Sequence, residues 1–151
     1  NENVPLSEIG TQELYMITAL DHIAIAVPNF EAAIKRFMED FGLPFEGTED
    51  VLAAKTKTAF FPLPATSIEL VHPLNGDGPI AKYIEKRGGG IHHLCFRSDN
   101  ILEDVARLKA KGYEFLSDSP SPGAHDSQVI FIHPKSCDGV LIEINQPSED
   151  H

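Results

Sequence analysis

Residues 20–27 read Leu20-Asp21-His22-Ile23-Ala24-Ile25-Ala26-Val27, and the pattern returns later as Ile91-His92-His93-Leu94-Cys95-Phe96. Alternating side chains rich in β-branched residues predict a strand in both places. Each strand is followed by an asparagine and an amphipathic stretch that ends at a glycine, in residues 29–42 and 100–112. Asparagine favours the start of a helix and glycine its end, so a helix is predicted after each strand.

The later parts of the two halves correspond as well. The first half contains Ile68-Glu69-Leu70 and the second Ile142-Glu143-Ile144, each preceded by an aromatic-containing strand that ends at a proline. The repeat predicts an α+β domain over residues 18–147, with two tandem βαβββ modules at about 18–75 and 90–147. A proline at its start and three glycines at its end predict a connecting helix at about 79–88. Residues 1–17 are expected to form a loosely attached tail.

Composition narrows the possible partners and compartments. The chain has 151 residues and a formal net charge of -11, which disfavours binding to nucleic acid or to anionic membrane surfaces. An apolar run as long as a membrane span, roughly 20 residues, is absent from the sequence. Two cysteines make no disulfide framework and suit a reducing compartment, such as cytosol or an organelle matrix.

Strand alternation predicts where the ionisable side chains point. His22 is expected to share a cavity-facing side with the small residues Ala24 and Ala26, while the intervening apolar residues cover a helix. The same alternation turns His93 toward the cavity and separates Glu69 and Glu143 from their apolar neighbours. A lone histidine or glutamate on a strand is usually structural or solvated. One of each repeated at matching places in both halves instead predicts a shared divalent cation, for which Co²⁺, Mn²⁺, Ni²⁺ and Zn²⁺ are suitable.

Several longer motifs carry a resemblance to a known family. They are residues 20–28, 68–74, 79–82 and 90–93, with His133-Pro134-Lys135 and residues 139–143. Together they resemble the methylmalonyl-CoA epimerase family of the vicinal oxygen chelate, or glyoxalase-like, superfamily, over residues 18–147. The resemblance implies a cupped mixed sheet, a homodimer, and a divalent metal such as cobalt held by His22, Glu69, His93 and Glu143. It also implies a cytoplasmic enzyme in a bacterium or a mitochondrial-matrix enzyme in a eukaryote.

The activity implied by the resemblance is metal-dependent epimerisation of (2R)- and (2S)-methylmalonyl-CoA. A carboxylate would remove the α-proton and a second acid would return a proton to the opposite face, with the enolate charge stabilised by the cation. Glu143 is the expected base. The second acid is unassigned, because Lys55 to Phe60, where a bacterial relative has a glutamate, contains no carboxylate; Glu49 and Asp50 are candidates or solvated surface residues.

Two further residues, Arg97 and His125, each have two interpretations. Arg97 either holds an anionic substrate group or forms an ion pair, and His125 is either part of the active-site rim or a solvated loop residue. His72 and His92 are expected to face outward as structural residues. Rival functions are a glyoxalase acting on a glutathione hemithioacetal, a ring-cleaving dioxygenase, and a non-catalytic ligand-binding protein of the same fold.

Overall fold

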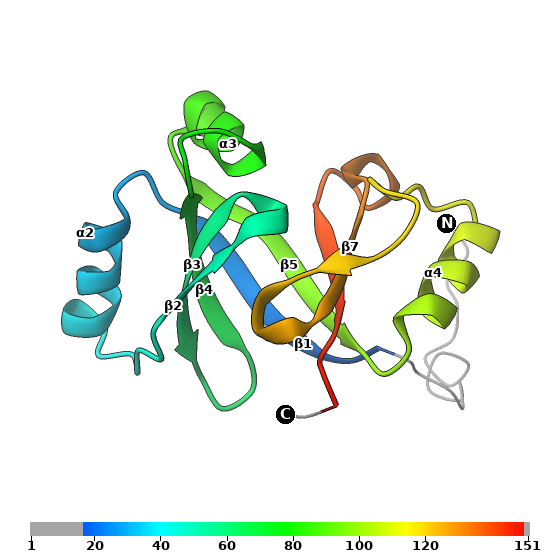
Figure 1. The fold of residues 1–151 in the computed structure, drawn as a ribbon, viewed down its shortest axis with the longest axis horizontal. Helices are drawn as coiled ribbons and strands as arrows, with labels where there is room; N and C mark the ends of the chain where they lie inside the picture. The colour runs from blue at the N-terminus through cyan, green and yellow to red at the C-terminus, as the bar shows by residue number, and fades with distance from the viewer. Residues whose placement is uncertain (1–16, 150–151) are drawn as a thin grey trace, which may run out of the picture.

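The computed structural model describes residues 17–149, whose strands form one sheet with helices outside it (Figure 1). The first half contains β1 (Ile17–Ala26), α2 (Phe30–Lys35), η1 (Arg36–Asp40), β2 (Thr48–Val51), η2 (Leu52–Ala54), β3 (Thr56–Pro62) and β4 (Ser67–Pro73). The connecting helix is α3 (Pro79–Arg87). The second half contains β5 (Gly90–Ser98), α4 (Ile101–Ala110), β6 (Ser121–Pro122), η3 (Ala124–Asp126), β7 (Gln128–Ile132), η4 (Pro134–Ser136) and β8 (Ile142–Gln146). The tail predicted for residues 1–17 lies outside the described residues, apart from Ile17, which begins β1.

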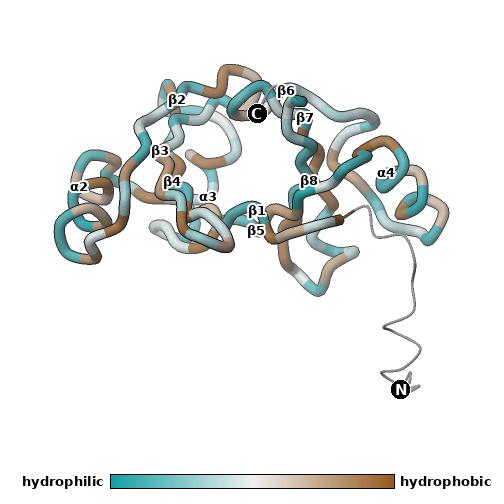
Figure 2. Tube along the Cα trace, turned by 90° about the horizontal axis from the view of Figure 1, so that it is seen from below, coloured by the Kyte–Doolittle hydropathy of each residue, from teal (hydrophilic) through white to brown (hydrophobic). Residues whose placement is uncertain are grey.

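The strand order shows how the two halves join. Within residues 17–149 the sheet has eight strands in the order β2-β3-β4-β1-β5-β8-β7-β6. β1 and β5 pair antiparallel at its centre, and each pairs in parallel with the last strand of its own half, β4 or β8. The sheet curls so that its edge strands β2 and β6 rise on the same side, with α2 and α4 outside (Figure 2). The predicted α+β class with a cupped mixed sheet is confirmed.

The first helix begins where the sequence predicts but ends in a different form. Asn29 caps α2 as expected, since its side chain accepts a hydrogen bond from the Ala32 N–H. After Lys35 the helix widens into a π-helical turn, in which the Phe41 N–H bonds the Arg36 carbonyl. The wider turn changes the helical phase, so Phe41 is 60% exposed rather than on the buried face.

Three apolar clusters hold the helices against the sheet. The largest lies under α4 and contains Ile101, Val105, Leu108, Ile130, Ile132, Ile142 and Ile144. The cluster at α2 contains Val27, Phe30, Ala33, Ala59, Phe61 and Leu70. The third lies at α3 and contains Ala24, Ala26, Val71 and Ile80. The small residues Ala24 and Ala26 therefore make room for the connecting helix and do not line the cavity, on whose side they were expected with His22.

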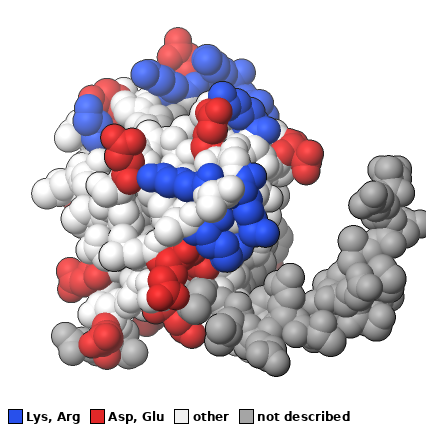
Figure 3. Space-filling view, turned by 90° about the vertical axis from the view of Figure 1, so that its right-hand side faces the viewer, with Lys and Arg blue, Asp and Glu red and all other residues white. Residues whose placement is uncertain are grey.

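A buried carboxylate anchors the start of α4. Asp104 is fully buried, accepts a hydrogen bond from the Ser98 hydroxyl, and pairs with the half-exposed Arg107 at 3.0 Å. Figure 3 shows this side of the molecule, where acidic and basic side chains lie close together. Asn100 caps the helix by accepting from the Glu103 N–H at 3.2 Å.

Replacing Asp104 by alanine is expected to lower the free energy of unfolding by roughly 3 kcal/mol, because it removes the buried partner of Arg107 and leaves the Ser98 hydroxyl without its acceptor. Urea denaturation followed by circular dichroism measures this change. Glu103→Ala is the matched control, since Glu103 is an exposed acid in the same helical turn and should cost about 0.5 kcal/mol. Equal losses in the two variants would contradict the anchoring role.

The described helices show no membrane-spanning segment: between residues 17 and 149 none is long and apolar enough to cross a bilayer.

Candidate metal centre and cavity

A cavity of about 850 Å³ lies inside the cup, lined by residues from both halves. Four central strands each place one predicted ligand on its wall: His22 from β1, Glu69 from β4, His93 from β5 and Glu143 from β8. His22, His93 and Glu143 are 5 to 7% exposed. The strand alternation predicted from the sequence therefore gathers all four side chains around one space, although they come from opposite halves.

Three of these side chains converge closely. The Nε2 atoms of His22 and His93 are 3.3 Å apart, and Glu143 Oε1 lies 3.1 Å from the first and 3.2 Å from the second. Glu143 Oε1 is buried and makes no hydrogen bond of acceptable geometry. Two imidazole nitrogens and a carboxylate oxygen gathered this closely are suited to a shared cation.

Glu69 contacts a different edge of the His22 ring. Its Oε2 lies 3.0 Å from His22 Nδ1, whereas Glu143 faces Nε2 of the same ring. Among the described residues, Glu69 is not in the group of ligand atoms that lie within 4.8 Å of one another. The structure thus brings His22, His93 and Glu143 together and places Glu69 immediately beside them.

Two β-bulges position the histidines. In the β1–β5 ladder, His22 pairs with Cys95 and Ala24 with His93, and the register shifts leave Asp21 and His92 unpaired. A bulge adds a residue and redirects the neighbouring side chains. Asp21 and His92 therefore both line the cavity. The outward orientation predicted for His92 was wrong, because a strict period of two does not allow for a bulge.

Each bulge residue contacts the histidine that follows it. Asp21 Oδ2 lies 2.7 Å from His22 Nδ1, and His92 Nδ1 lies 2.8 Å from His93 Nδ1. Burial and the nearby His93 ring lower the pKa of His92 to about 4, so its neutral ring can accept a hydrogen bond from the His93 Nδ1–H. Contacts of this kind orient a ligand ring with its Nε2 lone pair toward a cation. The adjacent polar pairs Asp21-His22 and His92-His93, repeated within apolar strands, were the sequence signal for these bulges.

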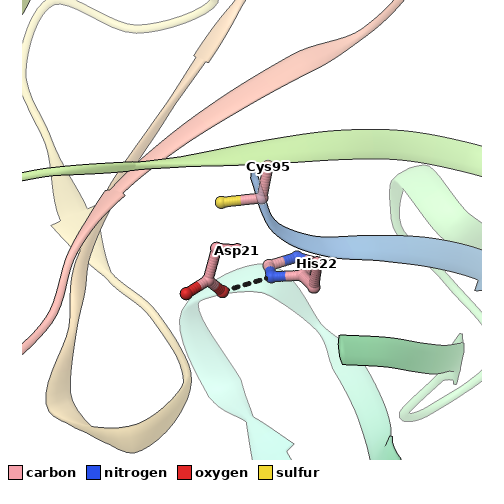
Figure 4. A group of neighbouring side chains, drawn as sticks. All are labelled: Asp21, His22 and Cys95. Atoms are coloured by element: carbon pink, nitrogen blue, oxygen red, sulfur yellow. Dashed lines mark hydrogen bonds and ion pairs between the residues drawn. The ribbon is translucent and has the colours of Figure 1, made fainter. Parts of the chain in front are cut away.

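A second group of ligand-type atoms shares His22. Asp21, His22 and Cys95 place an oxygen, a nitrogen and a sulfur within 4.8 Å of one another (Figure 4). Burial and the neighbouring Glu143 carboxylate raise the pKa of the Cys95 thiol, which keeps it protonated. Asp21 is also held by Arg97, whose Nη2 donates to Oδ1 at 2.7 Å. The His22, His93 and Glu143 group is therefore the better cation site.

Arg97 and His72 each contact a specific partner. Arg97 lines the cavity with half of its side chain exposed, and its ion-pair partner is Asp21 rather than a neighbour of Glu69 or Glu143. His72 Nδ1 donates to the Val27 carbonyl at 2.8 Å and its ring stacks on Phe30 outside the cavity lining, as its structural interpretation requires.

The wall formed by β3 carries hydroxyl groups. Thr56 and Thr58 are buried and line the cavity, whereas Lys57 turns outward over the Phe30 ring. Asp50 is exposed and is not among the lining residues. This strand therefore presents two threonines where a second carboxylate was sought.

Nearby charges outweigh the effect of burial on the pKa values of Glu143 and His22. Burial raises the pKa of the Glu143 carboxyl, but the adjacent His22 and His93 imidazoles outweigh it and hold the pKa well below its usual value. Burial lowers the pKa of His22, but the carboxylates of Glu69 and Asp21, together with Cys95 and Glu143, outweigh it and raise the pKa well above 6.5. When no cation is bound, these carboxylates therefore favour the protonated form of His22.

Cation binding at pH 7 is therefore expected to release roughly one proton from His22, and the affinity should fall about tenfold for each unit of decreasing pH. Titration calorimetry with Co²⁺ in two buffers of different protonation enthalpy measures the released proton. Identical binding heats in both buffers would show that His22 is already neutral in the metal-free protein.

The fold and the histidine–carboxylate centre define a class, and comparison with known proteins agrees with it. Residues 21–131 match the family model of the Glyoxalase/Bleomycin resistance protein/Dioxygenase superfamily, so the chain belongs to this superfamily, whose members bind divalent metals. The chain is 42% identical over 133 residues to an ethylmalonyl-CoA/methylmalonyl-CoA epimerase of Cereibacter sphaeroides, covering 87% of this chain and 99% of that protein. It is 38% identical to the mitochondrial methylmalonyl-CoA epimerase of Homo sapiens, covering 94% of this chain and 81% of that protein.

Solved structures give the same relationship. Methylmalonyl-CoA epimerase from Mycobacterium tuberculosis superposes with a TM-score of 0.87 at 31% identity, covering 93% of this chain and 95% of that one. A variant of the Streptomyces coelicolor epimerase in complex with 2-nitronate-propionyl-CoA gives a TM-score of 0.83 at 29% identity, covering 87% and 99%. Within the superfamily, the chain is thus a member of the methylmalonyl-CoA epimerase family.

Proposed function

We propose that this protein epimerises methylmalonyl-CoA by removing and returning the proton on the carbon between the carboxylate and the thioester. The observation that carries the proposal is the convergence of His22, His93 and Glu143 inside the cavity, in a chain that resembles epimerases over nearly its whole length. The α-proton of a thioester is removed easily only where the developing enolate charge is stabilised, and this group offers a place for the stabilising ion.

The donor set fits a divalent cation of intermediate softness. His22, His93 and Glu143 supply two nitrogens and one oxygen, and Glu69, with its side chain 13% exposed beside His22, is the proposed fourth ligand. The buried Glu143 oxygen without a hydrogen-bond partner supports this assignment, since such an atom is costly unless a cation compensates it. Co²⁺ is the preferred ion, with Mn²⁺, Ni²⁺ and Zn²⁺ as alternatives. When bound, the ion supplies positive charge next to the thioester oxygen.

Glu143 is the proposed base for one face of the reacting carbon. Its lowered pKa keeps the carboxyl ionised, and its position on β8 turns it into the cavity. Phe131 lies opposite it on β7 and packs edge-on against His93, which shields this part of the wall from water. An ionised carboxylate in a sheltered position can accept the α-proton without competing solvation.

The proposed substrate, oligomeric state and compartment are supported by the relatives. Another solved epimerase, 29% identical with a TM-score of 0.84, is described in complex with methylmalonyl-CoA, which supports an acyl-CoA thioester as substrate here. The family resemblance also supports a homodimer, which light scattering would detect as twice the mass of 16.6 kDa. Because the human relative is mitochondrial and others are bacterial, we expect the matrix in a eukaryotic source and the cytoplasm in a bacterial one.

The test is to incubate the cobalt-loaded protein with one epimer of methylmalonyl-CoA in D2O and to follow inversion and α-deuteration together. Both should occur, and both should stop when a chelator removes the ion. The glyoxalase alternative is tested in parallel with methylglyoxal and glutathione, which should give no product. Absence of metal-dependent α-exchange, or turnover of the hemithioacetal instead, would overturn the epimerase proposal.

A further inference from the structure

Epimerisation removes a proton from one face of the α-carbon and adds one to the opposite face, so it needs a second acid. The cavity offers few groups for this role. Among the described residues, the titratable side chains that line the cavity outside the proposed ligands are Asp21, Glu46, His92, Arg97 and His125. Asp21 is occupied by His22 and Arg97, and His92 is bound to His93. Arg97 does not release a proton under ordinary conditions. Glu46 and His125 are the remaining groups at the rim.

His125 is held at the cavity by contacts from the other half of the molecule. It lies in η3, at the tip of the β6–β7 hairpin, and its ring packs against Phe60 of β3 with centroids 4.3 Å apart and the ring planes tilted by 34°. Its backbone N–H donates to Glu49 of β2 at 3.1 Å, and Glu49 Oε1 lies 3.8 Å from its Nε2. The two edges of the curled sheet therefore meet at this residue, as the approach of β2 and β6 in Figure 2 illustrates.

The hairpin tip has a defined conformation that presents the ring. His125 and Asp126 have φ angles of 54° and 58°, in the left-handed region that residues with a side chain seldom adopt. Ser127 closes the tip, since its backbone carbonyl accepts from the Gly123 N–H at 2.9 Å and its hydroxyl donates to the Ala124 carbonyl at 2.7 Å. Non-glycine residues persist in this region where surrounding contacts over-determine them.

The position of His125 is opposite the proposed base. Phe60, which contacts the His125 ring, pairs directly with Glu69 in the β3–β4 ladder, so one side chain separates His125 from the proposed ligands. Glu143 lies on β8, and the strands β4, β1 and β5 separate β8 from β3 around the cup. A thioester bound between these two walls would have Glu143 on one face and His125 on the other.

We propose that His125 is the second catalytic acid–base group of the epimerisation, and this inference rests on the proposed function. In one direction, the α-carbon–hydrogen bond breaks and the proton passes to Glu143, while the electron pair moves toward the thioester oxygen. The N–H bond of the His125 imidazolium then breaks as a carbon–hydrogen bond forms on the opposite face. In the reverse direction the two groups exchange roles, and afterwards each exchanges its proton with solvent, which His125 reaches with 57% of its side chain exposed.

The test uses His125→Gln in the metal-loaded full chain, with each epimer of methylmalonyl-CoA supplied separately in D2O. Inversion should fall at least about 100-fold in both directions, which is the usual effect of losing a general acid–base group. One epimer, whose α-hydrogen faces Glu143, should still exchange that hydrogen for deuterium with retained configuration, while the other should not exchange. Metal content should equal that of the wild type. His133→Gln is the matched control, because His133 lies outside the cavity lining and should leave all rates unchanged.

Two results would overturn the role of His125: wild-type inversion of both epimers by His125→Gln, or an equal loss of exchange from both. The one-sided pattern appearing in Glu46→Gln instead would assign the second acid to Glu46 and likewise overturn it. If the wild-type protein itself exchanges neither epimer, the epimerase proposal fails, and that outcome is distinct from a defect confined to the variant.

Discussion

Glu143→Gln is expected to lower kcat for epimerisation by at least about 1,000-fold, because it removes a charged ligand and the proposed base together. Glutamine has nearly the same size, so the packing against Phe131 and the two histidines is retained. The initial rates of inversion and of α-deuteration measure the effect. Both should fall in parallel, because the carboxylate is also a proposed ligand of the ion that stabilises the enolate formed from either epimer.

Glu114→Gln is the matched control for this substitution. Glu114 is an exposed acid whose pKa is lowered by its hydrogen bond to Lys135, 2.7 Å away, and it does not line the cavity. It should leave kcat unchanged. If Glu143→Gln retained more than about a tenth of wild-type activity, the carboxylate would have no part in proton transfer.

His93→Ala is expected to abolish stoichiometric metal binding while the protein stays folded, with the affinity falling by more than about 100-fold. His93 supplies one of the three converging atoms, and its removal leaves only His22 and Glu143 in the group. Elemental analysis after dialysis against Co²⁺ gives the stoichiometry, and circular dichroism confirms folding. Epimerisation should be lost together with the metal.

His133→Ala serves as its control. This histidine lies at the start of η4, where its Nδ1 accepts from the Lys135 N–H at 3.1 Å, away from the cavity lining. It should retain one metal ion for each chain. Unchanged metal content in His93→Ala would show that the ion, if bound, lies elsewhere in the molecule.

The symmetry of the duplicated strands explains why three of the proposed ligands meet. β1 and β5 are equivalent strands that pair antiparallel, so the equivalent residues His22 and His93, which pair with Cys95 and Ala24, lie close together with their Nε2 atoms 3.3 Å apart. Their parallel partners β4 and β8 then place Glu69 and Glu143 on either side. The sequence repeat supplies one histidine and one glutamate from each half, and these four residues form a single centre that neither half contains alone.

The amino-acid sequence by itself determined the two βαβββ modules and the inward faces of His22, Glu69, His93 and Glu143. These follow from local patterns: a period of two along strands, asparagine caps, and a repeat that can be read directly. The family resemblance added the metal and the substrate, which no local pattern specifies.

Only the tertiary structure decided which further residues enter the cavity. The bulges turn Asp21 and His92 inward, and the curling of the sheet brings Glu49 of β2 to His125 of the β6–β7 hairpin. A bulge depends on the register of two strands, and the meeting of two sheet edges depends on the accumulated twist of every strand between them. Neither is encoded in a short stretch of chain, so both become visible only when the whole sheet is assembled.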